Sequence, residues 1–329
     1  MKTQPPDLGW EVIANALSLH WGIDDVSLTY VPLGFGSHHW VANEPCGRKW
    51  LVTIDDLRNH HLADLPAAAF EALVVAFRTA VALRDMAGLR FVVGPMVNGN
   101  GGCVVRMDQH YAMVVFPHLD VEPSDFGEFR NLADRDDAMR LIGAVHNATS
   151  IVPLDALRRD TLEIFNRAGL FDALSTMDLE WDSGPYATRA QGFLRDRGAL
   201  VFRKFERFDR LVRSVAGDHS EWVLTHGEPH AGNVIRTWTG DLVVVDWDTV
   251  AYAPRERDLW MMVNDASPDW SAYGDVTGVS SLSQAALDAY RLHWDLREIA
   301  IYVSWLRQSH GQTEEMEIAW SSLQQYIAR

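Results

Sequence analysis

The chain has 329 residues, enough to bury a sizeable core, and 47% of them are apolar, as is ordinary for a soluble globular protein. Its net charge of −16, with 21 basic and 34 acidic residues after residue 117, disfavours nucleic acid and anionic membranes and suits a cationic small molecule. The sequence shows no secretory signal, no apolar run approaching a membrane span, and no metal or disulfide pattern in its two cysteines. We therefore expect a cytoplasmic protein, with no protein partner indicated.

The first 117 residues read mainly as strands. Alternating apolar residues and turn signals separate these strands, while apolar residues at helical spacing mark two helices, one of them long. The predicted elements are a helix at 7–23, strands at 26–33, 41–43 and 49–55, a helix at 66–86, and strands at 91–97, 103–107 and 111–116. This pattern predicts a mainly antiparallel sheet that carries one long helix.

From about residue 124 the pattern becomes helical. The predicted helical segments are 134–149, 153–175, 186–215, 255–264, 283–309 and 313–328, and one β-hairpin near residue 240 interrupts them. We expect an α+β protein with a β-rich N-terminal lobe, residues 1–117, that binds a nucleotide. A mostly helical C-terminal lobe, residues 118–329, would carry catalysis and the substrate. This two-lobe layout is typical of the protein-kinase-like fold.

The stretch 226–248, HGEPHAGNVIRTWTGDLVVVDWD, concentrates the polar side chains that phosphoryl transfer needs. Glu228 is placed to accept a proton from a substrate hydroxyl, and Asn233 and Asp246 offer the hard oxygen ligands that Mg²⁺ prefers. Any one of these residues alone would be read as a loop acid or a turn cap, but their combined spacing favours a catalytic site. Asp248 is either a second metal ligand or a helper.

Two histidines flank Glu228 in this stretch. His226 and His230 are four residues apart, which in a helix would suggest zinc, but Pro229 and Gly232 argue against a helix here. We expect His226 to belong to the catalytic site as a residue that braces the loop.

Two further segments are candidates for nucleotide binding. The turn LGFGS contains Gly34 and Gly36, which let main-chain amides approach phosphates, with Ser37 and His38 at its tip. A plain hairpin turn is the alternative. At the junction of the two lobes, Pro117 could offer a carbonyl and Leu119 an N–H to a nucleotide base, and the missing N–H of the proline would cost nothing.

Acidic and aromatic residues near the C-terminus are candidates for holding an amino sugar, because carboxylates pair with ammonium groups and aromatic faces stack on sugar rings. We expect two or three of them to touch substrate. They are Asp265, Asp269, Trp270, Tyr273, Asp275, Asp295 and Glu298.

The blocks HGEPHAGN, VDWD and APRERDL together resemble the aminoglycoside phosphotransferase family, over nearly the whole chain. The resemblance implies a kinase-like fold and transfer of the ATP γ-phosphate, with GTP an alternative donor, to a hydroxyl of an aminocyclitol or aminoglycoside antibiotic. It places Glu228 at the catalytic aspartate. It assigns Asn233 and Asp246 to Mg²⁺ and Asp258 to a buried structural role.

The chain departs from the family pattern at two places. Glu228 stands where the family usually has aspartate, and Thr53 stands where a lysine normally grips the α- and β-phosphates. Lys49 lies roughly 13 Å away along a strand, so it does not substitute in this register, and Glu71 would lack its partner. An arginine, or Mg²⁺ together with the Gly-rich turn, would then hold the phosphates in place of the lysine. These departures keep open a nucleotide-binding pseudokinase, and a kinase of another hydroxylated metabolite is a further alternative.

Overall fold

The computed structural model describes residues 4–34, 36–58, 65–121, 127, 129–215, 219–263 and 268–329. The chain divides into two compact units, one formed by Met1–Arg159 with Trp222–Ser280 and the other by Asp160–Glu221 with Ser281–Arg329. The predicted lobe boundary at residue 117 lies inside the first unit. The two-lobe division therefore stays a prediction, and each unit is described by itself.

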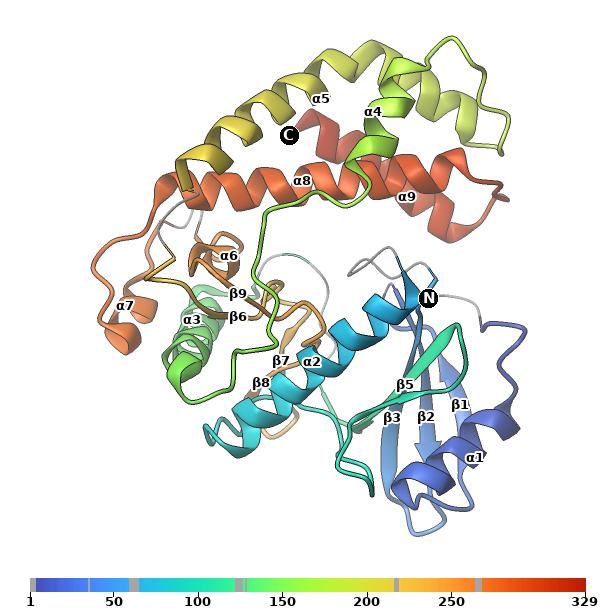
Figure 1. Ribbon diagram of the computed structural model, residues 1–329, viewed down its shortest axis with the longest axis vertical. Coiled ribbons are helices and arrows are strands. Elements are labelled where there is room, and N and C mark those ends of the chain that lie inside the picture. The colour runs from blue at the N-terminus through green and yellow to red at the C-terminus, as the bar shows by residue number, and fades with distance from the viewer. Residues whose placement is uncertain are drawn as a thin grey trace. The chain divides into compact units, whose positions relative to one another are not determined.

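A five-stranded antiparallel sheet forms the N-terminal part of the first unit (Figure 1). Its strands, in spatial order, are β1 Ser27–Val31, β2 Ser37–Asn43, β3 Lys49–Asp56, β5 Tyr111–Pro117 and β4 Val104–Arg106. Side chains alternate between the two faces of such a sheet, and residues opposite each other in register share a face. The register therefore decides which face each polar residue of β2 and β3 occupies.

The first face of this sheet is covered by the helix α1, Trp10–Trp21, and is apolar. Its core includes Trp40, Val52 and Ile54, which are all at most 2% exposed. The helix ends at Gly22, which adopts the left-handed conformation (φ 64°) that glycine takes without strain. This face is thus part of the hydrophobic core.

The helix α2, Pro66–Asp85, buries a stripe of apolar side chains that includes Leu73 and Phe77. The ring of Phe77 meets Phe116 of β5 edge-on, with 5.6 Å between centroids. By length and composition alone α2 would also qualify as a membrane span, although the sequence led us to expect none. One such helix is weak evidence, because the core helix of a soluble protein passes the same test.

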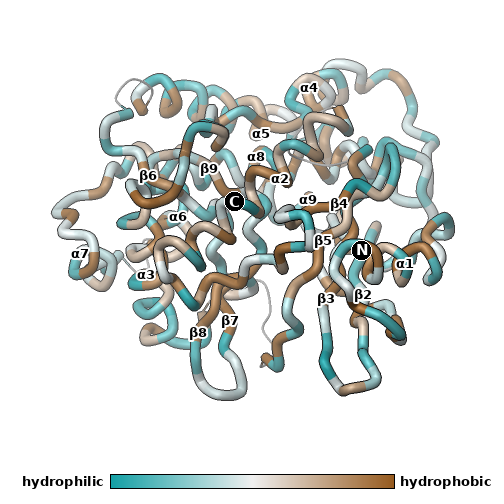
Figure 2. Tube along the Cα trace, turned by 60° about the horizontal axis from the view of Figure 1, so that its bottom comes forward, coloured by the Kyte–Doolittle hydropathy of each residue, from teal (hydrophilic) through white to brown (hydrophobic). Residues whose placement is uncertain are grey.

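The rest of the first unit supports a polar loop with two small β-ribbons. Strand β6, Val223–Thr225, pairs with β9, Ala251–Ala253, and β7, Val234–Arg236, forms a hairpin with β8, Leu242–Val244. Figure 2 shows the hydrophobic strands of this hairpin joined by a more polar turn. The remaining elements are α3 Leu132–Asn147, the 3₁₀ turn Ala148–Ser150, α6 Glu256–Leu259 and α7 Ser271–Thr277.

The second unit is helical and consists of α4 Arg167–Ser175, α5 Ala187–Val215, α8 Gln284–Arg307 and α9 Glu314–Ala328. Helix α8 packs against each of the other three helices. Lys204 of α5 and Asp295 of α8 form a largely buried ion pair, with 3.0 Å between Nζ and Oδ2. The sheet and these helices confirm the predicted α+β class.

Several predicted elements differ from the observed ones. Residues 91–97 form no strand, and Val92 makes only an isolated bridge to Val244. At Gly94 the main chain runs so close to α2 that an added Cβ would lie 3.3 Å from the Ala80 backbone, and Pro95 follows with no N–H to donate. The segment 153–166 is not helical, the described part of 255–264 contains only the short α6, and α7 was not predicted.

Candidate active site

The loop that follows β6 carries His226, Gly227 and Glu228 and is held by the imidazole of His226. Its Nε2–H donates to the carbonyl of Val245 at 2.8 Å, and its Nδ1 accepts from the N–H of Glu228 at 3.1 Å. The ring also meets the indole of Trp247, with 4.6 Å between centroids. Burial lowers the pKa of His226, so the ring is neutral and fixed in one tautomer.

Asp258 of α6 anchors the same loop through its main chain. Its carboxylate accepts from the N–H groups of His226 at 2.8 Å and Gly227 at 2.6 Å. His146 of α3 donates to it at 3.0 Å and in turn accepts from the hydroxyl of Tyr273 at 2.9 Å. Burial alone would raise the pKa of Asp258, but the hydrogen bond from His146 and the charge of Arg257 hold it below its usual value.

Glu228 and Asn233 are joined within the loop, because the amide of Asn233 donates to the carbonyl of Glu228 at 3.0 Å. The carbonyl of Asn233 accepts from the N–H of Val245 at 2.9 Å, which ties the loop to the segment after β8. The Asn233 side chain also hydrogen-bonds Asp246. The structure therefore brings together the three residues that the sequence spacing grouped.

Asp246 is held in an unusual main-chain conformation. Its φ of 65° is in the left-handed region, which costs a non-glycine residue about 1–2 kcal/mol and is common at functional sites. Desolvation by the surrounding protein, and then the charges of Asp248, Glu228 and Asp55, raise the pKa of Asp246 well above its usual value. The site thus gathers negative charge around the carboxylate of Asp246.

A divalent cation would relieve this repulsion. The amide oxygen of Asn233 and the carboxylate of Asp246 are the kind of hard donors that hold Mg²⁺ when phosphate oxygens and water complete its shell. No group of three or more His, Cys, Asp or Glu side chains in the described ranges is arranged to hold a metal by itself. The donor set therefore fits a cation shared with a nucleotide rather than a closed protein site.

Polar residues of β2 and β3 lie on the face of the sheet opposite to α1. Ser37 is opposite Asp55, and His39 is opposite Thr53, so all four share one face. The hydroxyl of Ser37 donates to Asp55 at 2.5 Å. Because the charge of Asp55 contributes to the raised pKa of Asp246, this face is within electrostatic range of Asp246.

His38 was a predicted nucleotide ligand, and the structure places it elsewhere. It is opposite Ile54, on the α1 side of the sheet, and its Nδ1 lies 3.2 Å from the hydroxyl of Tyr30. Its neighbour His39 lies on the opposite face of the sheet, which it shares with Thr53. Because side chains alternate between the two faces of β2, the two neighbouring histidines must lie on opposite faces. Which face each of them occupies could be decided only from the register that the turn sets.

The other residues predicted to contact a nucleotide lie in the glycine turn before β2 and at the end of β5. Gly34 and Gly36 both have positive φ, 54° and 94°, as a tight glycine turn before β2 requires. Pro117 ends β5 opposite Trp50, and Leu119 follows where the chain leaves the sheet. Their roles as nucleotide ligands remain predictions.

Three of the seven candidate substrate residues make contacts inside the protein. Asp295 pairs with Lys204, and Arg297 and Glu298 form an ion pair on α8 with a closest N–O distance of 3.3 Å. Tyr273 bonds to His146, as described above, and Asp265 lies outside the described residues. The remaining three help to line a pocket of about 500 Å³ at α7. They are Asp269, Trp270 and Asp275.

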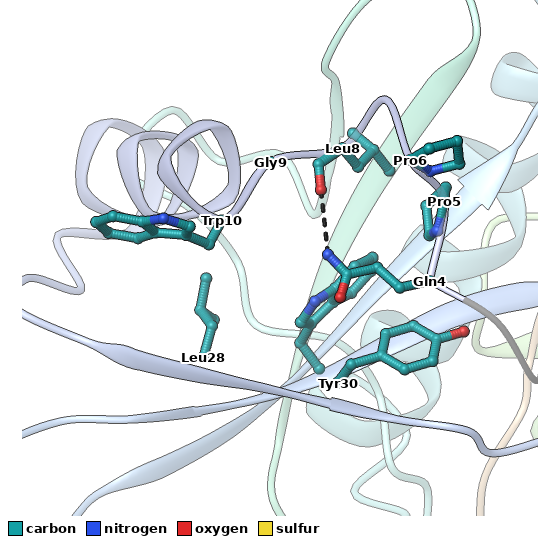
Figure 3. A pocket seen from close by; sticks show the side chains of 9 residues that line it. Gln4, Pro5, Pro6, Leu8, Gly9, Trp10, Leu28 and Tyr30 are labelled. Atoms are coloured by element: carbon teal, nitrogen blue, oxygen red, sulfur yellow. Dashed lines mark hydrogen bonds between the residues drawn. The ribbon is translucent and has the colours of Figure 1, made fainter.

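A second pocket, of about 460 Å³, lies on the α1 side of the sheet (Figure 3). It is lined by residues of the chain start, where Gln4 bonds the carbonyl of Leu8 at 3.4 Å, and by Trp10, Leu28 and Tyr30. Neither pocket is lined by residues of the loop that carries His226, Gly227 and Glu228. The candidate active site is therefore identified by its chemistry and not by these pockets.

Residues 41–302 match the Phosphotransferase enzyme family, a span that includes the loop, the hairpin and Asp258. The chain belongs to this family. The sequence match thus agrees with the hydrogen-bonded group of Glu228, Asn233 and Asp246, and this phosphotransferase has the kinase-like fold that the sequence predicted.

Solved structures show the same fold at low sequence identity. A spectinomycin phosphotransferase in complex with ADP and spectinomycin superposes with a TM-score of 0.76 at 16% identity, covering 98% of this chain and 97% of that one. A microcompartment-associated aminopropanol kinase gives 0.59 at 16% identity, covering 97% and 96%. An amicoumacin kinase in complex with AMP-PNP, Ca²⁺ and its substrate gives 0.58 at 12%, covering 98% and 92%. No curated protein matches the sequence.

Proposed function

We propose that this phosphotransferase moves the γ-phosphate of ATP to a hydroxyl group of a cationic small molecule in the cytoplasm. The observation that carries the proposal is the hydrogen-bonded group of Glu228, Asn233 and Asp246, held by His226 and Asp258. A carboxylate, an amide and a second carboxylate in this arrangement suit the positioning and charge stabilisation on which phosphoryl transfer depends.

Glu228 is the proposed catalytic base. Its half-buried side chain extends from a loop whose main chain is fixed on both sides, and it would accept the hydrogen bond of the acceptor hydroxyl and then its proton. Asn233 and Asp246 would hold Mg²⁺, which neutralises charge on the transferred phosphoryl group. His226 and Asp258 are positioning residues, because they contact the loop through its main chain.

The proposed acceptor is an aminocyclitol or aminoglycoside antibiotic, with spectinomycin the first compound to test. Support comes from the similarity to the spectinomycin phosphotransferase and from the acidic composition of the chain. An amino alcohol is the second candidate, because the aminopropanol kinase shares the fold. An ammonium group is common to both, and an acidic protein attracts such a cation.

ADP release measured with a coupled assay tests the proposal across spectinomycin, aminoglycosides and amino alcohols, each with MgATP and with MgGTP. We expect turnover with at least one amine-bearing acceptor, and its loss in Glu228→Gln and Asp246→Asn. Asp241→Asn, in the turn of the same hairpin, is the matched control and should retain activity. Full activity in Asp246→Asn would overturn the proposed roles.

A pseudokinase is the competing function, and Thr53 at the usual lysine position is the observation that favours it. Such a protein would bind Mg-nucleotide without turning over any acceptor in the panel. Measurement of ADP binding by calorimetry, alongside the assay, separates the two functions.

A further inference from the structure

The sheet lacks the expected cation at Thr53, and the nearest cations of β3 do not replace it. Lys49 is opposite Asn43 at the start of the strand, four residues from Thr53. Arg58, just beyond the strand, is bound to Asp56 by two side-chain hydrogen bonds of 2.8 and 2.6 Å. Directly opposite Thr53 lie Val114 of β5 and His39 of β2, and only His39 can carry a charge.

His39 shares a face with Thr53 and Asp55, and this face is within electrostatic range of Asp246. The Gly-rich turn ends two residues before His39, at Ser37, so the imidazole stands between that turn and the place of the missing lysine. A phosphate chain held by the turn and by the cation at Asp246 would therefore pass this side chain.

The ring of His39 has one nitrogen in use and one without a partner. It makes a hydrogen bond to the main chain of Leu33, in which a ring N–H donates to the carbonyl. Its Nδ1 is inaccessible to solvent and has no hydrogen-bond partner in the described part of the chain. A buried polar atom without a partner costs about 1–3 kcal/mol, and such atoms are uncommon in folded proteins.

We propose that His39 takes up a proton from solvent when a nucleotide binds and donates Nδ1–H to an α- or β-phosphate oxygen, in the place of the family's lysine. The inference rests on the proposed ATP-dependent function and adds a nucleotide-binding residue to it. The buried Nδ1 reaches the phosphate by rotation of the ring, and protonation converts this unpartnered nitrogen into a donor. One proton is consumed for each nucleotide bound.

The surroundings of His39 make this protonation depend on the ligand. Burial, with a smaller contribution from the neighbouring His38, lowers the pKa of His39 to about 4, although the charge of Asp55 acts to raise it. The buried side of α2 carries no charged side chain. The ring is therefore neutral without nucleotide, and the negative charges of a polyphosphate are what would favour its charged form.

Calorimetric titration of the protein with Mg-ADP tests the inference without any turnover. Runs from pH 6 to 8, in buffers of different ionisation enthalpy, report both Kd and the number of protons taken up. For the wild type we expect proton uptake on binding and weaker binding as the pH rises. His39→Gln should lose the uptake attributable to the protein and bind roughly ten- to a hundredfold more weakly at pH 6.

His38→Gln is the matched control, because its side chain lies on the α1 side of the sheet. It should keep the proton uptake of the wild type. Thr53→Lys supplies the missing cation directly, so this variant and its combination with His39→Gln should bind Mg-ADP tightly without proton uptake by the protein.

Two outcomes separate this inference from the proposed function. Equal proton uptake and equal Kd in the wild type and a folded His39→Gln overturn the role of His39 and leave the kinase activity standing. Absence of Mg-ADP binding by the wild type overturns both. If His39→Gln does not fold, proton uptake that persists unchanged in Thr53→Lys also overturns the inference.

Discussion

The carboxylate of Asp258 lies 2.6 Å from the main-chain nitrogen of Gly227, and this contact joins α6 to the residue that immediately precedes the proposed base. The same carboxylate also binds the N–H of His226 and the ring of His146. A single buried acid thus orients the catalytic loop without approaching the reacting atoms. Substitutions at this contact, and at three other positions in the structure, should have measurable consequences.

Asp258→Asn should lower the free energy of unfolding by about 2–4 kcal/mol, because the amide presents donors to main-chain donors in a buried site. The pKa of Asp258 is lowered in the folded state, so the unfolded chain takes up the proton first. This contribution is therefore present above the unfolded pKa of about 3.9 and is lost as the pH falls. Urea unfolding from pH 7 to 3.5 should show a shallower acid slope in the variant, and identical slopes would contradict the assignment.

Gly227→Ala should disrupt the catalytic loop. The residue has φ 106°, and an added Cβ would lie 2.5 Å from the guanidinium nitrogens of Arg257, which are themselves bonded to Thr225 and Thr249. We expect a loss of about 2–4 kcal/mol in unfolding free energy and a large drop in kcat. Gly240→Ala is the control, because Gly240 has φ 94° but open space around it, and it should cost about 1 kcal/mol with kcat kept.

Glu228→Asp tests whether the extra methylene of the proposed base is tuned to this site. Shortening the side chain withdraws the carboxylate from the acceptor hydroxyl, so we expect kcat to fall roughly tenfold with the KM for ATP unchanged. Glu228→Gln, which removes the base, should lower kcat about 10²–10⁴-fold. Steady-state kinetics with a saturating acceptor distinguishes the two, and equal losses in both variants would show that reach is unimportant.

Lys204→Met should destabilise the helical unit by about 3–5 kcal/mol at pH 7, because it leaves the buried Asp295 without its cation. Burial already raises the pKa of Asp295 in the wild type, and loss of Lys204 should raise it further. The contribution of Asp295 to the stability of the variant should therefore be most favourable below the unfolded pKa of about 3.9 and fall as the pH rises through its raised folded pKa. Thermal unfolding at pH 4.5 and 7 checks this.

The double variant Lys204→Met/Asp295→Leu removes both charges of this pair and should recover most of the stability at pH 7. A double variant as unstable as Lys204→Met alone would show that packing, and not the unpaired carboxylate, causes the loss.

Much of the candidate site was accessible from the sequence because its parts are close together along the chain. Glu228 and Asn233 lie on one loop, and Asp246 follows the hairpin that begins directly after that loop, so local hydrogen bonds suffice to bring them together. The helices α1, α2, α8 and α9 were also predicted nearly to their ends, because apolar spacing and terminal residues mark them.

Predictions from the sequence were wrong where a contact between residues far apart in the chain, or the register of a strand, determines the structure. Residues 91–97 look like a strand, but close approach to α2 at Gly94 and the proline that follows leave only a bridge. Glu71, the candidate partner for a β3 lysine, is exposed on α2, and its role stays a prediction.

The sequence by itself determined the family, the α+β class and the chemical identity of the catalytic loop, because these depend on residue types at short spacing. Only the tertiary structure decided that Asp258 holds the loop, that Asp55 lies within electrostatic range of Asp246, and that His39 rather than His38 lies opposite Thr53. The physical reason is that side chains alternate across a sheet, so a register set by the turn and by packing against α1 assigns each residue to its face.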